Sequence, residues 1–218
     1  MLVGDWMSQN VVTATEDVSM IKAGRILRDK KIRRLPVVDK EGRLLGIVSE
    51  RDLKAASPSS ATTLDMYEMT YLLSEMKLKA IMTKNPLSIR PTDTVERAAL
   101  IMRDRKIGCL PVVEESGKLV GIITDTDIFR LFVSITGIDQ GGIQIGIRLD
   151  TSEGSLKPVL DALRHHEARI ISILSSYDRA DATRRDVSIR IQGLPEVRER
   201  ELRAALEATS QLLYWTRD

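Results

Sequence analysis

Two stretches of the chain carry the same pattern of apolar and polar positions. Residues 30–52 read KKIRRLPVVDKEGRLLGIVSERD, and residues 105–127 read RKIGCLPVVEESGKLVGIITDTD. The offset of 75 residues holds without a gap from Met7 to Leu53. Chance apolar patterning would not keep one register for so long, so the pattern indicates an internal duplication.

Each repeat begins with a predicted short strand and an amphipathic helix. The strands are expected at Val11–Ala14 and Leu87–Ile89. In the second repeat, Thr94 is the expected N-cap of the helix. The apolar positions at helical spacing are Met20, Ala23, Gly24 and Leu27 in the first repeat and Val95, Ala98, Ala99 and Met102 in the second.

Two apolar runs follow in each repeat and predict a hairpin. The turn between the runs carries Gly42 in the first repeat and Gly117 in the second. A second helix is expected to start near Asp52 and near Asp127. Because each repeat is too small to bury its sheet alone, the two are expected to pack sheet to sheet as a pair.

The segment between the repeats, residues 54–79, predicts a loop followed by a helix. Its beginning, AASPSSATT, is a loop by composition. The apolar side chains of the helix-like run after it are Leu64, Tyr67, Met69, Tyr71, Leu72 and Met76. Such a helix either covers one face of the paired repeats or binds a partner.

After residue 134 the pattern changes. Gly137, Gly141 and Gly142 mark a linker. Strands are expected at 143–149, 168–178, 186–193 and 212–216, and helices at 155–165 and 196–209. The order β-α-β-β-α-β is that of the ferredoxin-like split βαβ unit.

The sequence therefore predicts a mixed α+β fold. Two repeats packed as a pair precede a ferredoxin-like domain. The expected boundaries are 1–53 for the first repeat, 54–79 for the linker with its helical insertion, 80–134 for the second repeat, 135–141 for a linker and 142–218 for the last domain.

Composition and charge narrow the cellular context. The net charge is only +2, so no global field draws the chain to nucleic acid or membrane. A single cysteine, Cys109, fits a reducing compartment. The N-terminal residues lack the pattern of a signal peptide, and the longest apolar stretch, residues 128–138, is too short to span a membrane. We expect a cytoplasmic protein.

The motif G-I-x-S/T-x-x-D ends each repeat and suits a nucleotide. The hydroxyl of Ser49 or Thr124 lies where a strand becomes a helix, beside free amide donors that attract a phosphate. A carboxylate three residues later, Asp52 or Asp127, can accept both hydroxyls of a ribose. Helix N-capping by the aspartate explains the same pattern, and both roles are compatible.

These repeats resemble a tandem pair of CBS domains, the Bateman module. The motifs M-S/T-x-N near each start, LPVV after the first helix, and G-I-x-S/T-x-x-D carry the resemblance over residues 1–134. It implies binding of AMP, ADP, ATP or an adenosyl compound at sites shared between the repeats. By this resemblance Ser49 and Asp52 face Thr83, Leu87 and Ile107, whereas Thr124 and Asp127 face Ser8, Val12 and Ile32.

Cations near the phosphates are expected to separate the two sites. Arg33 and Arg34 precede LPVV in the first repeat, where the second repeat has Gly108 and Cys109. The site with Asp127 is therefore expected to bind polyphosphates better, because it borrows this arginine pair. The alternative is that both arginines are surface charges.

The C-terminal segment resembles an ACT domain. The residues that carry the resemblance are Asp150, Gly154, Ser155, Leu156 and the helix continuing to Leu163. The family's turn has a proline where this chain has Glu153, and the turn here is one residue longer. An amino acid is expected to bind there through its carboxylate, because free helix amides lie beside Gly154. A capped turn in a purely dimerising domain is the alternative.

The order of these domains, with a Tyr/Met-rich insertion after the first repeat, is similar to bacterial acetoin utilisation proteins of the B type. The sequence offers no base, nucleophile or metal-ligand set of an enzyme: His165 and His166 diverge on a helix, and Asp125 and Asp127 lack a third ligand. We expect a homodimeric regulator that senses a ligand and modulates a partner protein. The alternative is a structural, dimerising protein with vestigial nucleotide sites.

Overall fold

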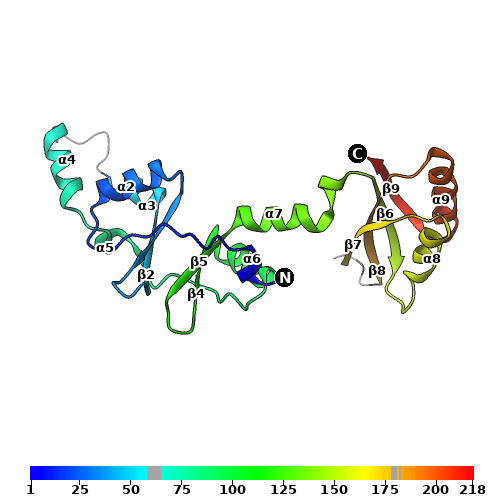
Figure 1. The fold of residues 1–218 in the computed structure, drawn as a ribbon, viewed down its shortest axis with the longest axis horizontal. Coiled ribbons are helices and arrows are strands. Elements are labelled where there is room, and N and C mark those ends of the chain that lie inside the picture. The colour runs from blue at the N-terminus through cyan, green and yellow to red at the C-terminus, as the bar shows by residue number, and fades with distance from the viewer. Residues whose placement is uncertain (58–64, 178–180, 182) are drawn as a thin grey trace. The chain divides into compact units, whose positions relative to one another are not determined.

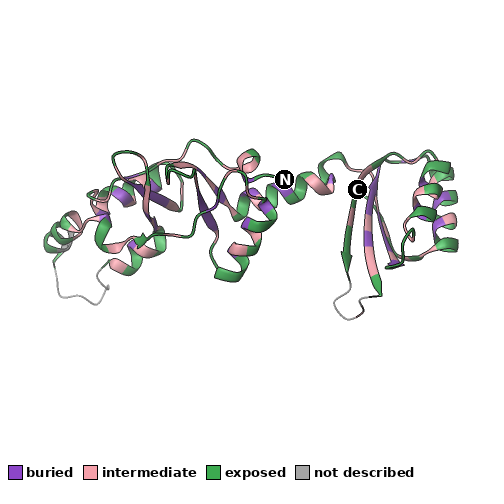
Figure 2. Cartoon of the chain, turned by 90° about the horizontal axis from the view of Figure 1, so that it is seen from below, coloured by how far each residue is buried: buried purple, intermediate pink, exposed green. Residues whose placement is uncertain are grey.

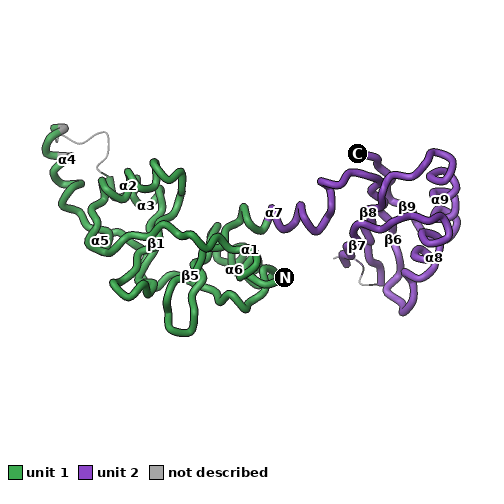
Figure 3. The backbone as a smooth tube through the Cα atoms, in the orientation of Figure 1, with its two compact units in different colours: residues 1–128 green, residues 129–218 purple. Residues whose placement is uncertain are grey.

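The computed structural model describes residues 1–57, 65–177, 181 and 183–218. They form two compact units, the first unit (residues 1–128) and the C-terminal unit (residues 129–218), coloured separately in Figure 3. Leu64 and residues 58–63 of the expected loop lie outside the described residues. Within the described residues, no helix combines the length and the apolar character that a membrane crossing needs.

The two repeats have the same elements in the same order (Figure 1). The first repeat contains α2 (Met20–Asp29), β1 (Arg34–Val38), β2 (Leu44–Ser49) and α3 (Glu50–Ala56). The second contains α6 (Val95–Arg105), β4 (Cys109–Val113), β5 (Leu119–Thr124) and α7 (Asp125–Thr136).

The expected helices and hairpins are confirmed. Thr94 caps α6, since its side chain accepts a hydrogen bond from the Arg97 amide at 3.2 Å. Gly42 and Gly117 occupy the hairpin turns at φ of +81° and +80°, a region that glycine adopts without steric cost.

The prediction of strands at Val11–Ala14 and Leu87–Ile89 is wrong. Each is reduced to a single parallel bridge, Ala14 with Val37 and Ile89 with Val112. The next bond of each ladder would need an N–H from the proline at the centre of β1 or β4, and proline has none. The segments therefore lie along the sheets without forming strands.

The segment that leads into each repeat completes the sheet of the other repeat. Residues 1–8 include α1 (Val3–Trp6), and the corresponding residues 76–83 include α5 (Leu78–Ile81). After α5 comes β3 (Thr83–Lys84), which pairs with β2 of the first repeat, whereas Ser8 forms a bridge with Ile122 of the second. We call these two stretches the lead-in segments. Their exchange joins the repeats into one unit.

Two glycines make room for this exchange. A β-carbon at Gly46 would overlap the side chain of Met82, and one at Gly121 would overlap the side chain of Met7. The hydrophobic core shows the same interdependence, because the fully buried Leu78 of α5 packs with the core of the first repeat. The close approach of the lead-in segments thus explains part of the need for glycine in the motif G-I-x-S/T-x-x-D.

The helix of the insertion, α4 (Met66–Glu75), has two different faces. Leu73, with Met76 just beyond its end, packs partly buried against the first repeat's core. Tyr67 and Tyr71 are 88% and 66% exposed, and Figure 2 shows most of α4 as exposed. The helix therefore covers part of the core and also presents an aromatic surface.

The C-terminal unit confirms the expected order of elements. Its elements after α7 are the 3-10 helix η1 (Ile138–Gln140), β6 (Ile143–Asp150), α8 (Lys157–His165), β7 (Ile170–Tyr177), β8 (Arg184–Ile191), α9 (Glu196–Thr209) and β9 (Gln211–Arg217). The antiparallel sheet has the order β7-β8-β6-β9, and both α8 and α9 cover one face of it (Figure 1). Its core is built from the alternate apolar residues of β6 and β8 that face these helices.

Candidate functional site

Two cavities in the first unit gather residues from both repeats. The larger, of about 510 Å³, is lined by Ser49, Asp52, Thr83, Leu87 and Ile107, among others. We call it the Asp52 cavity. All five of these residues were expected at one site from the sequence, and the structure brings them together.

The second cavity, of about 410 Å³, is named the Thr124 cavity. It is lined by Ser8, Val12, Ile32 and Thr124, four of the five residues expected at the other site. Asp127, the fifth, is not among its lining residues; Asp125 and Thr126 are. The duplication thus produces two related cavities that differ in their acidic side chains.

Ser49 and Asp52 form a capping box at the start of α3. The Asp52 carboxylate accepts hydrogen bonds from the Ser49 amide and hydroxyl, both at 2.7 Å, and the Ser49 hydroxyl accepts one from the Asp52 amide at 3.2 Å. Asp52 remains only partly buried and lines its cavity. Its carboxylate can therefore still contact a ligand.

Thr124 and Asp127 repeat this arrangement at the start of α7. The Asp127 carboxylate accepts hydrogen bonds from the Thr124 amide at 2.9 Å and hydroxyl at 2.7 Å. However, Asp127 is only 3% exposed. Its capping role is visible in the structure, and its contact with a ribose stays a prediction.

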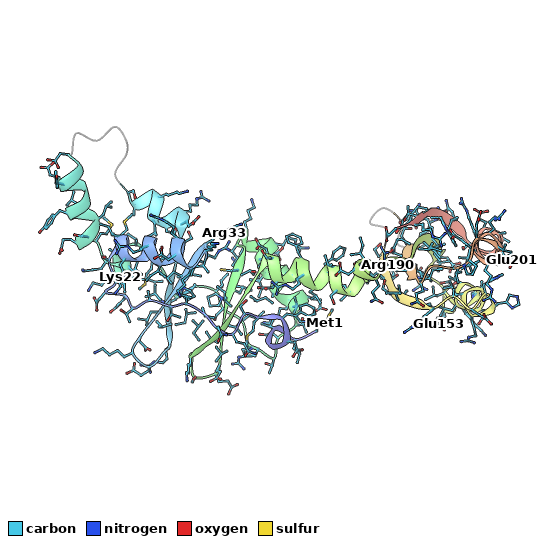
Figure 4. The ribbon with its side chains drawn as sticks, turned by 45° about the horizontal axis from the view of Figure 1, so that its top comes forward. Met1, Lys22, Arg33, Glu153, Arg190 and Glu201 are labelled. Carbon is cyan, nitrogen blue, oxygen red and sulfur yellow. The ribbon has the colours of Figure 1, made fainter. Side chains whose placement is uncertain are left out.

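The cations are distributed differently from the sequence-based expectation. Arg33 and Arg34 line both cavities, so the assignment of this pair to the Asp127 site alone is wrong. Arg51 and Lys106 add positive charge to the Asp52 cavity, whereas Lys31 does so in the Thr124 cavity. Carboxylates oppose part of the charge in both cavities: Glu50 and Asp52 in the Asp52 cavity, and Asp125 in the Thr124 cavity. Figure 4 labels Arg33, directly before β1.

Lys31 and Lys106 were missed by the sequence analysis. They occupy corresponding positions after α2 and α6, and both adopt a left-handed backbone conformation, with φ of +52° and +53°. Such conformations are uncommon for residues other than glycine and gather at functional sites. The repeat register would have paired these two lysines, but it gives no sign of their backbone conformation.

Cys109 lines the Asp52 cavity as a buried thiol. Burial raises its pKa to about 11, although the nearby Arg34 acts in the opposite direction. The thiol therefore stays protonated at neutral pH and contributes a small apolar wall. Across the described ranges, no cluster of three or more His, Cys, Asp or Glu side chains could hold a metal ion.

The turn before α8 contains the residues expected to bind an amino acid. The Asp150 carboxylate accepts hydrogen bonds from the Ser152 amide and hydroxyl, which lower its pKa. Gly154 has a φ of +80°, and Leu156 at the N-cap of α8 provides no side-chain acceptor. The expectation of free helix amides beside Gly154 is wrong for the first two helical residues, because the Lys157 amide donates to the Gly154 carbonyl at 2.8 Å and Pro158 has no amide hydrogen.

Arg185 is a further cation at this turn that the sequence analysis missed. Its guanidinium donates a hydrogen bond to the Ser155 hydroxyl at 2.9 Å, and its Nε is buried without a partner. It comes from β8, so only the pairing of β8 with β6 brings it close to residues 150–155.

The comparison with known families identifies the repeats. The model of the CBS domain family matches residues 3–59 and 78–134. A CBS domain-containing protein of Dictyostelium discoideum is 34% identical over 134 residues, which cover 62% of this chain and 92% of that protein. By contrast, the chain matches about a quarter of a homoserine O-acetyltransferase of Methanohalobium evestigatum (33% identity over 59% of this chain, 24% of that enzyme).

Three solved structures are similar to the first part of the chain. A candidate acetoin utilization protein (AcuB) from Vibrio cholerae has a TM-score of 0.54 at 34% identity, covering 64% of this chain and 95% of its own. CBSX2, a CBS-pair protein from Arabidopsis thaliana, was solved in complex with AMP and has a TM-score of 0.52 at 34% identity, covering 62% and 97%. The CBS domain pair of protein MJ0100, in complex with 5′-methylthioadenosine and S-adenosyl-L-methionine, has a TM-score of 0.51 at 31% identity, covering 61% and 95%.

Proposed function

Because this chain belongs to the CBS domain family, we propose that its paired repeats bind an adenine nucleotide or adenosyl compound and thereby regulate a partner protein. The observation that carries the proposal is the gathering of five sequence-predicted residues around the Asp52 cavity. The ligands of two similar structures, AMP in one and adenosyl compounds in the other, support it.

The chemistry of the Asp52 cavity fits each part of such a ligand. Leu87 and Ile107 provide apolar walls between which an adenine ring can lie. The carboxylate of Asp52 can accept hydrogen bonds from ribose hydroxyls. Arg33 and Arg34 can bind phosphate oxygens through charge-assisted hydrogen bonds. The side chains at this cavity thus match the polarity of a nucleotide from base to phosphate.

Calorimetry with AMP, ADP, ATP and S-adenosylmethionine tests the proposal. We expect at least one to bind the wild-type chain and the Asp52→Asn variant to lose at least tenfold in affinity at one site, about 1.4 kcal/mol. The Asp161→Asn variant, which makes the same charge change on an exposed residue of α8, is the control. If none of the four binds wild-type protein at millimolar concentration, the sensor proposal fails and a structural role replaces it.

We further propose that the C-terminal unit is an ACT-like domain that binds an amino acid at residues 150–156. Arg185 favours this, since a guanidinium at the turn, bonded to Ser155 and with its Nε buried without a partner, suits a carboxylate. A thermal-shift screen of the twenty amino acids should give a hit that Arg185→Gln abolishes. A hit that persists unchanged in both this variant and Gly154→Val would place the ligand elsewhere.

A homodimer completes the proposed function. Phe129 and Phe132 of α7 are 69% and 57% exposed, and β9 is an edge strand with Leu213 and Tyr214 partly exposed. Such surfaces favour association with a second copy. Light scattering that shows only monomer at micromolar concentration, with and without nucleotide, would refute this.

A further inference from the structure

We propose that Arg33 and Arg34 are one phosphate-binding pair shared by both cavities, so that a polyphosphate in one cavity weakens polyphosphate binding in the other. This inference rests on the proposed nucleotide binding and adds a coupling between the two sites. Its starting point is that both arginines line the Asp52 cavity and the Thr124 cavity.

The backbone places these arginines beside the start of α3. The Glu50 amide donates to the Arg33 carbonyl at 3.1 Å, and Arg34 pairs with Ser49 in the hairpin. In the second repeat the Asp125 amide makes the same bond to the Gly108 carbonyl at 3.1 Å. Residues 33 and 108 are therefore structural counterparts at the two helix starts.

The absence of a side chain at Gly108 lets Arg34 reach the other helix start. A β-carbon at Gly108 would lie 2.6 Å from Nη2 of Arg34 and 2.7 Å from Oδ2 of Asp125. The Arg34 guanidinium thus lies beside Gly108 of the second repeat, while the Arg34 backbone pairs with Ser49 of the first. One side chain therefore extends from the first helix start toward the second.

The remaining charges determine how strongly each cavity depends on the shared pair. The Asp52 cavity has Arg51 and Lys106 of its own, with Glu50 and Asp52 beside them. The Thr124 cavity has Lys31 of its own, with Asp125 beside it. In each cavity carboxylates match these remaining cations, so a triphosphate in either cavity relies on Arg33 and Arg34 for neutralisation.

Occupancy of one cavity by a polyphosphate changes the other through this pair. A guanidinium edge that binds one phosphate in a two-bond contact is no longer available to a second phosphate. A second polyphosphate would also add negative charge where the neutralising cations are already engaged. AMP carries a single phosphate, so its coupling between the cavities is expected to be weaker.

Single-cavity variants provide the test. Val12→Trp fills the Thr124 cavity and leaves the Asp52 cavity, whereas Leu87→Trp does the reverse. ATP binding is measured by calorimetry in each background, alone and combined with Arg34→Gln. Arg51→Gln and Lys31→Gln serve as matched charge controls, because each lines only one of the two cavities.

We expect Arg34→Gln to lower ATP affinity at least fivefold in both backgrounds, and each control to do so in one background only. On wild-type protein the second ATP should bind at least tenfold more weakly than ATP binds the corresponding single-cavity variant. An effect of Arg34→Gln in one background alone, or two ATP molecules that bind wild type with the single-cavity affinities, overturns the inference.

Replacement variants and an AMP titration separate a failure of the coupling from a failure of nucleotide binding. If a tryptophan variant fails to fold by circular dichroism, Ile32→Trp and Ile107→Trp fill the same two cavities instead. If neither wild type nor any folded variant binds ATP or AMP, the proposed nucleotide binding itself fails. Nucleotide binding without a shared effect of Arg34 leaves the proposed function intact and rejects only the coupling.

Discussion

Replacing Asp127 and Asp52 separately by asparagine distinguishes a structural carboxylate from a ligand-binding one. Each carboxylate accepts two hydrogen bonds from the residue three positions earlier. Hydrogen bonds to charged groups are worth about 1.5–3 kcal/mol and neutral ones about 0.5–1.5 kcal/mol. Loss of the charge therefore weakens each bond by roughly 1 kcal/mol.

Burial decides how much of this loss appears in the free energy of unfolding. Asp127 is 3% exposed, so its two weakened bonds should cost the Asp127→Asn variant about 2 kcal/mol. Asp52 is only partly buried, and water can replace part of what is lost, so Asp52→Asn should cost about 1 kcal/mol or less. Ligand affinity should show the opposite order, with the larger loss for Asp52→Asn.

The assay follows the first unit alone. The chain has two tryptophans, Trp6 in α1 and Trp215 in β9, and Trp215→Phe leaves only the one in the first unit. Urea unfolding of this background, with and without each asparagine substitution, gives the free energies. If Asp127→Asn is no less stable than Asp52→Asn and instead loses AMP binding, the assignment of Asp127 as mainly a cap is refuted.

Three further predictions concern other parts of the chain. The Arg148 guanidinium lowers the pKa of Asp186 in the folded chain. Their ion pair therefore stabilises the C-terminal unit above the ordinary aspartate pKa of 3.8, and this contribution is lost as the pH falls below that value. In urea titrations the stability difference between wild type and Arg148→Gln should accordingly disappear at acid pH. Gly46→Ala should destabilise the first unit by about 1–3 kcal/mol in urea unfolding because the new β-carbon would lie 2.9 Å from the Thr83 carbonyl oxygen, and an unchanged midpoint would contradict that packing. Cys109 should resist iodoacetamide at pH 8 until urea unfolds the chain, because burial raises its pKa to about 11; rapid labelling of folded protein would show that the thiol is reachable.

The duplicated pattern predicted the helices and hairpins because local rules govern them. Thr94 caps α6, and Gly42 turns its hairpin, through contacts between near neighbours in sequence. The strands at Val11–Ala14 and Leu87–Ile89 failed because their pairing depends on a distant strand whose central proline cannot donate. Apolar alternation does not reveal which partner a segment meets.

The candidate site was predictable in its residue types and less so in its charges. The repeated motif pointed to Ser49 and Asp52, and the resemblance to CBS domains implied the neighbours that line the Asp52 cavity with them. Alignment of the repeats could not show that Arg34 reaches across Gly108, because the length and direction of a side chain are not part of a register. Arg185 was missed for a related reason, because strand pairing alone brings it to Ser155.

The exchange of lead-in segments has a consequence for how the chain is made. Synthesis proceeds from the N-terminus, and domains generally fold as they leave the ribosome. The first repeat cannot complete its sheet until β3 has emerged, and Ser8 has no strand partner until Ile122 is available. The beginning of the nascent chain must therefore wait for nearly the whole first unit, so this unit is expected to fold in one late step after translation of β5.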